Sequence, residues 1–140
     1  MGLLTDFVIA KKAEAASLAE STNPTEDFEG VEAKGLDPVK LESLWALLAR
    51  GGKRTGKFKM VKTASDEGPW VLDVPAEFTR FLASLAEKDA TGVVKAWAAT
   101  EEMEADGWKT EDARRALDLL VAVARKATKK KSGLLMWMSM

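Results

Sequence analysis

The chain has 140 residues, 46% of them hydrophobic, a net charge of −1, and neither cysteine nor histidine. Without cysteine there are no disulfides, thiol nucleophiles or thiolate metal sites, and without histidine the commonest general base is missing. Serine–histidine triads and zinc sites built on histidine or cysteine are therefore excluded. Only carboxylate or lysine chemistry and oxygen-ligated cations remain. We assign no catalytic residue, no metal site and no cofactor, and we expect a non-enzymatic role more than an enzymatic one.

The length suits one domain spanning residues 1–140. Residues 1–12 place two lysines after an apolar stretch, which is the reverse of a secretory signal peptide. No apolar run approaches the ~20 residues that a membrane-spanning helix requires. We therefore expect a soluble, cytoplasmic protein without a membrane partner.

The first quarter of the chain contains one clear strand pattern and one clear helix pattern. Residues 7–10 (FVIA) predict a short strand, and the alanine-rich residues 12–21 predict a helix. Residues 22–34 contain turn residues and acids but no periodicity. This segment is expected to be a surface loop or a mobile linker.

A second helix is predicted from Asp37, which can cap the first turn, and Pro38, which is tolerated at the first helical position. Its apolar stripe consists of Leu41, Leu44, Trp45 and Leu48. Gly51 and Gly52 are expected to end it. Residues 58–61 and 70–74 then predict the two strands of a β-hairpin.

Three further helices are predicted before the C-terminus. One begins at Pro75, and one begins at Asp89 or Thr91 and continues through VVKAWAATEEM to a turn at Asp106–Gly107. The third covers residues 110–131 and is the longest. In this helix Thr110 is the expected N-cap, Leu117 and Leu120 lie on the apolar face, Leu119 and Val123 form a second apolar face, and Gly133 is the expected left-handed terminator.

The apolar tail, residues 134–138, predicts a final strand in which Leu135 and Trp137 face one way and Leu134, Met136 and Met138 the other. It is expected to pair with residues 7–10 or with the hairpin. The predicted fold class is α+β and mostly helical, with about five helices and a small, mainly antiparallel sheet.

Three segments, MGLLTDFVIA, AWAATEEM and LLMWMSM, resemble those of small bacterial proteins of uncharacterised function. The resemblance covers the two ends of the chain better than its middle. It implies a whole-chain domain, and it implies no activity and no residue roles.

The most positive segment contains six basic and no acidic side chains within residues 50–62. Within it, Gly51 to Lys57 matches the GxxxxGK pattern of a phosphate-binding loop, but Phe58 stands where serine or threonine would hold magnesium. A helix is also expected before the loop and a strand after it, whereas a phosphate-binding loop follows a strand and opens a helix. We predict that nucleoside triphosphates are not bound there, and that nucleic acid is an unlikely partner of a chain that is acidic overall. Lys53, Arg54 and Lys57 remain candidates for binding another anion, with solvated lysines as the plainer interpretation.

An acidic cluster, Glu101, Glu102, Glu104 and Asp106, is bracketed by Trp97 and Trp108. If one helix continues through it, Glu101 lies one turn after Trp97, and a carboxylate against an indole ring can have a raised pKa. Glu101 is therefore a ligand-binding candidate. A solvated acidic helix end is the more ordinary interpretation.

Two functional hypotheses follow. The first is a non-enzymatic protein-interaction module whose partner is another protein or a second copy of the chain, based on the charge blocks and on five tryptophans. The alternative is a small-ligand or phosphate-binding protein, which includes the case of an enzyme that uses carboxylates. A flat apolar patch favours the first, and a deep cleft lined by Glu101 or Lys57 favours the second.

Overall fold

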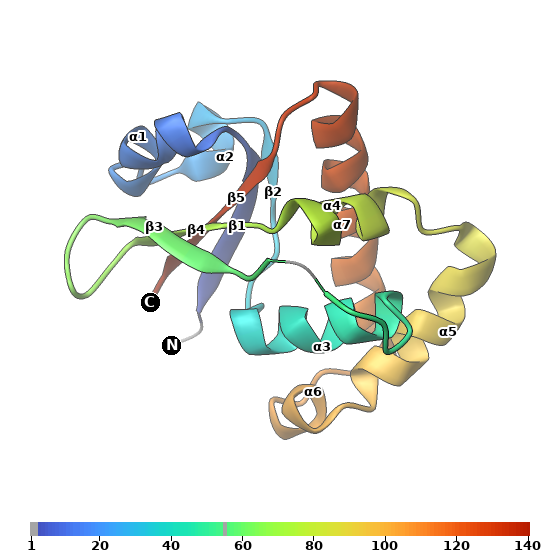
Figure 1. Ribbon diagram of the computed structural model, residues 1–140. Helices are drawn as coiled ribbons and strands as arrows, with labels where there is room; N and C mark the ends of the chain where they lie inside the picture. Colours follow the sequence, from blue (N-terminus) through green and yellow to red (C-terminus); the bar gives the residue numbers. More distant parts are fainter. Residues whose placement is uncertain (1–2, 55) are drawn as a thin grey trace.

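The computed structural model describes residues 3–54 and 56–140, and its centre is one five-stranded sheet (Figure 1). The strand order is β2-β1-β5-β4-β3, and every neighbouring pair is antiparallel. The strands are β1 (Leu4–Ile9), β2 (Gly30–Glu32), β3 (Lys59–Thr63), β4 (Trp70–Asp73) and β5 (Leu134–Ser139). The predicted antiparallel sheet and the predicted hairpin are confirmed.

Seven α-helices and one 3-10 turn surround the sheet within the described residues, so the predicted α+β class is confirmed. The helix count exceeds five because three of the helices have only four or five residues. The elements are η1 (Lys12–Glu14), α1 (Ala15–Ala19), α2 (Pro24–Asp27), α3 (Pro38–Leu48), α4 (Ala76–Ala83), α5 (Glu87–Ala98), α6 (Glu101–Ala105) and α7 (Thr110–Lys129).

The tail is the central strand of the sheet. Strand β5 pairs with β1 on one side and with β4 on the other, so both predicted pairings occur together. Trp137 is 5% exposed. Alternation along β5 places Leu134 and Met136 in the larger core and Leu135 and Trp137 in a smaller one, which confirms the predicted faces.

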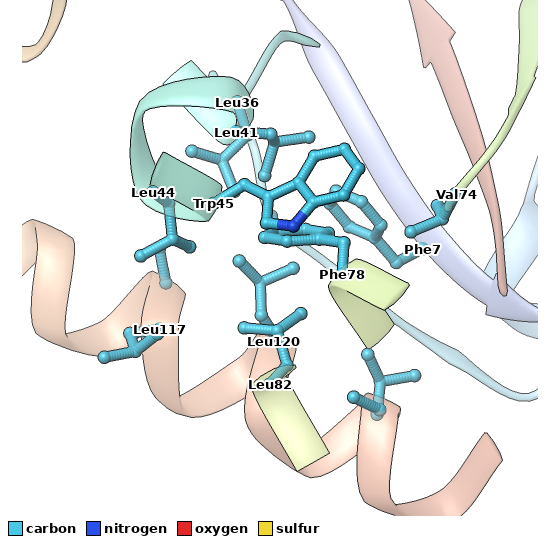
Figure 2. Close-up of a cluster of buried hydrophobic side chains, with 14 of the residues drawn as sticks. Phe7, Leu36, Leu41, Leu44, Trp45, Val74, Phe78, Leu82, Leu117 and Leu120 are labelled. Carbon is cyan, nitrogen blue, oxygen red and sulfur yellow. The ribbon is translucent and has the colours of Figure 1, made fainter. Parts of the chain in front are cut away.

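The two faces of the sheet are covered by different helices (Figure 1). Helices α3, α4 and α7 pack on the face that carries the larger core, and η1, α1 and α2 lie on the face with the smaller core. Figure 2 shows side chains from β1, α3, α4 and α7 converging around Trp45. Its indole is 1% exposed and lies 5.7 Å from the ring of Phe78.

Helix α3 begins as predicted, with the side chain of Asp37 accepting the backbone N–H of Lys40 at 2.9 Å.

Helix α7 buries Leu117 and Leu120 completely. Three details of α7 were wrongly predicted. Lys109 is the N-cap in place of Thr110, because its backbone N–H reaches the Asp112 carboxylate at 2.9 Å.

The other two wrongly predicted details of α7 are the left-handed residue that follows the helix and the burial of its second apolar face. The left-handed residue after the helix is Lys131, with φ of 54°, and not Gly133, because the chain turns before it reaches that glycine. Val123 is buried, whereas Leu119 is 38% exposed, because the helices beside α7 leave that side uncovered.

The predicted loop at residues 22–34 contains helix α2 and strand β2. Strand β2 is only three residues long, too short for a periodic signal. Its first residue, Gly30, packs so closely on β1 that an added Cβ would lie 2.2 Å from the Phe7 carbonyl oxygen. Backbone proximity, which hydropathy does not record, therefore determines this strand.

The helix predicted through VVKAWAATEEM is two helices. Helix α5 starts earlier than predicted, at Glu87, and ends at Ala98. Thr100 is extended, with ψ of 153°, and its hydroxyl donates to the Trp97 carbonyl at 2.7 Å. This break separates Trp97 from the acidic cluster.

Candidate functional site

The three basic candidates, Lys53, Arg54 and Lys57, lie exposed on the connection between α3 and β3. Arg54 donates a hydrogen bond of 3.2 Å to the backbone oxygen of Glu42, which ties the loop to α3. Thr55, inside the predicted Gly51–Lys57 motif, lies outside the described residues. A helix precedes the loop and a strand follows it, so no helix N-terminus faces a ligand there.

The acidic candidate Glu101 is exposed at the first residue of α6. Two neighbouring carboxylates make contacts that hold elements of the fold together. Glu102 accepts a hydrogen bond from the Ser43 hydroxyl, and Asp106 lies 2.5 Å from the ammonium of Lys40. Two of the four predicted acids therefore attach α6 and the following turn to α3.

Several of the contacts between these elements converge on Lys40. Its side chain is 3% exposed, and its ammonium contacts Asp106 and also Asp37, at 2.9 Å. Burial opposes the charged form, yet the hydrogen bonds to both carboxylates outweigh it and raise the pKa of Lys40 above its usual value. The Trp97 indole N–H donates to the Lys40 carbonyl at 3.0 Å, which joins α5 to the same point.

The four predicted site residues do not converge on one site. Within residues 3–54 and 56–140, no hydrogen bond or ion pair joins Glu101 to Lys53, Arg54 or Lys57. Basic residues at the C-terminal end of α7 pair with an acid from another part of the chain. Lys126 and Lys130 pair with Glu29 just before β2, and burial only partly offsets the resulting fall in the pKa of Glu29.

A groove of about 310 Å³ lies elsewhere, between the edge strand β2 and helix α7. Its apolar lining comes from Ala33, Trp108, Ala116 and Leu119, and its charged lining from Glu32, Lys34, Asp106, Asp112 and Arg115. Three of these five charges are already compensated, because Arg115 pairs with Asp112 at 2.6 Å and Asp106 pairs with Lys40. Glu32 and Lys34 remain at the strand edge without an ion pair among the described residues.

Trp108 forms the aromatic part of the groove. It is half-buried, and its ring lies 6.4 Å from that of the buried Trp97. The other side of the indole lies against Gly35, where an added Cβ would be 3.2 Å from the ring and φ is 90°. Gly35 thus supplies both the left-handed backbone and the room for the ring.

A larger hollow of about 610 Å³ lies between α5 and the start of α7. Its lining includes Lys95, Arg114 and Arg115, and contains no aromatic residue. Arg114 is engaged by Glu87 and Asp118, at 2.5 and 3.1 Å. We favour the smaller groove as the functional site because it combines an indole ring with an unpaired strand edge.

A buried carboxyl group lies beside this groove. Asp6 is 5% exposed and is the direct cross-strand partner of Glu32. Burial, and then the negative charge of Glu32, raise the pKa of Asp6 from 3.8 to about 6. Among the described residues, no cation and no hydrogen-bond donor reaches either carboxylate.

Sequence reasoning missed Asp6, Glu32 and the buried Lys40. Asp6 stands within LTDFVI, and a carboxylate in a strand that is apolar on both sides is a signal that could have identified it. Lys40 gave no signal, because its burial depends on Asp106, which is distant in sequence.

No helix among the described residues is long and apolar enough to cross a membrane. The same part of the chain holds no cluster of three or more aspartate or glutamate side chains placed to bind a metal ion. Comparison of the chain with protein-family models, with curated proteins and with solved structures found no match.

Proposed function

We propose that the protein is a non-enzymatic interaction module that binds another protein through the groove between β2 and α7. The observation that carries this proposal is the combination of half-buried Trp108 with Leu119, which is 38% exposed, beside an unpaired strand edge. Tryptophan is enriched among residues that dominate binding energy, and a leucine on an uncovered helix side offers apolar area to a partner.

The alternative, a small-ligand or phosphate-binding protein, has less support. Its predicted residues are Lys53, Arg54, Lys57 and Glu101, and they lie on separate exposed elements. None of them lines either of the two hollows described above. A small ligand usually needs several polar groups converging in one cavity.

Capture of partners from an extract of the native host tests the proposal. The immobilised wild-type chain is compared with Leu119→Arg and with a matched control, Met60→Arg. Met60 is 52% exposed on β3, at the opposite edge of the sheet. We expect a protein that wild type and Met60→Arg retain and Leu119→Arg loses, while all three chains keep similar melting temperatures. Identical retention by all three chains would refute the groove as the interaction surface.

A further inference from the structure

The outer edge of β2 presents unpaired backbone groups. Towards β1, the Ala33 N–H donates to the Thr5 carbonyl and the Ile9 N–H donates to the Glu29 carbonyl, both at 2.8 Å. Residues 29, 31 and 33 therefore bond to β1. Because backbone groups alternate in direction along a strand, those of Gly30, Glu32 and Lys34 point away from the sheet.

This edge differs from the other edge of the sheet. Strand β3 has an irregular register between Met60 and Lys62 and carries two lysines, Lys59 and Lys62, features that discourage strand addition. The edge of β2 has no such irregularity, and the groove lies directly beside it. An added strand is therefore accommodated better at β2.

Beside Lys34, the same edge carries the carboxylate of Glu32, which has no ion pair among the described residues. The register places Trp137, Asp6 and Glu32 in one row across β5, β1 and β2, so their side chains share a face. Asp6 is 5% exposed, and its carboxylate has no hydrogen-bond or ion-pair partner among the described residues. The next position in the row lies outside the sheet, and a cation there would face two carboxylates.

Resting on the function proposed above, we infer that the groove binds an extended peptide as a sixth strand, antiparallel to β2, with a lysine or arginine opposite Glu32. Every neighbouring pair in the sheet is antiparallel, which favours that direction. The basic residue exchanges two backbone hydrogen bonds with Glu32, and its side chain lies in the row with Asp6. This is strand addition with charge complementarity.

The residues that flank the basic one are apolar. In an extended strand they point to the opposite face of the sheet. On that face the groove presents Ala33, Trp108, Ala116 and Leu119. The recognised motif is therefore a basic residue between two apolar ones.

The probe is a capped peptide, Ser-Leu-Lys-Val-Ser, titrated into the ¹⁵N-labelled full chain and followed by amide chemical shifts. We expect the outward-pointing amides of Gly30, Glu32 and Lys34 to shift. Shifts centred on β3 instead would overturn the inference.

Two comparisons separate strand addition from general attraction. N-methylation of the peptide lysine removes the N–H that bonds to Glu32, and we expect affinity to fall about tenfold or more. N-methylation of the valine, whose N–H points away from β2, is the matched control and should change affinity little. Equal losses at both positions would overturn strand addition.

The charge requirement is tested by replacing the peptide lysine with glutamine. Affinity for wild type should fall about tenfold, and much less for the Glu32→Gln variant. Glu101→Gln, which removes an exposed carboxylate on α6, is the control and should behave as wild type. If Glu32→Gln also behaves as wild type, the assignment of the basic residue is wrong.

Failure of the inference can be told apart from failure of the proposed function. If no peptide binds but Leu119→Arg still loses a captured protein, the groove is an interaction surface without strand addition. If Leu119→Arg loses nothing and no peptide binds, both are wrong.

Discussion

Replacement of Asp6 by asparagine should remove a pH dependence of stability that the wild-type chain carries. A carboxyl group whose pKa is higher in the folded than in the unfolded chain binds its proton more tightly when folded. Its contribution is therefore fully present below the unfolded pKa of 3.8 and is lost as pH rises through the folded pKa of about 6. The rise in pKa corresponds to about 3 kcal/mol, because each pKa unit is worth ~1.4 kcal/mol.

The assay is urea unfolding followed by tryptophan fluorescence, for wild type and Asp6→Asn. The free energy of unfolding of wild type, relative to the variant, should fall by about 3 kcal/mol between pH values of about 3 and about 8. Other carboxylates titrate in both proteins and cancel in the difference. Glu32→Gln should retain most of the effect, because burial of Asp6 is the larger cause. A difference that does not change with pH would show that Asp6 ionises normally. The inference that burial raises the pKa of Asp6 would then be wrong.

Four further outcomes are expected. Leu117→Ala should lower the free energy of unfolding by ~2–5 kcal/mol, since its side chain is fully buried; a loss under ~1 kcal/mol would make α7 peripheral. Lys40→Met should cost about 1–3 kcal/mol by urea unfolding, less than a fully buried pair because Asp106 is 57% exposed, and an unchanged midpoint would contradict a stabilising role for the contact between Lys40 and Asp106. Deleting residues 134–140 removes the central strand and should abolish the cooperative thermal transition seen by circular dichroism. Calorimetry should detect no ATP binding, and binding that is lost in Lys57→Ala would reverse that prediction.

The segments that were predicted correctly from the sequence are those with a regular hydrophobic period. The tail was predicted as a strand with the correct faces, although not as the central strand, because its alternation is regular over Leu134 to Met138 and both neighbouring strands offer matching apolar faces. The long helix was predicted for the same reason, although its cap was placed one residue late. Strand β2 was missed because three residues carry no period and its pairing is set by the approach of Gly30 to β1.

The candidate site was the least predictable part. Clusters of like charge drew attention to Lys57 and Glu101, yet the structure leaves both exposed and far from sharing a cavity. Of the five tryptophans noted in the sequence, Trp108 alone lines the groove. Its position depends on Gly35, which is distant from it in the sequence. A site made by a strand edge, a glycine and a helix side is a property of the tertiary fold, so local composition did not reveal it.

The carboxylate row connects stability to the proposed recognition. Asp6 faces no cation among the described residues, and at neutral pH its ionisation opposes folding. An asparagine or an apolar residue would fill the same strand position without that cost, so packing alone does not account for a carboxylate there. A basic side chain opposite Glu32 would lower this cost, because a cation beside the row favours the ionised form of Asp6. On this proposal the group destabilises the fold less when the partner binds, as at sites where local stability is lower than packing would allow.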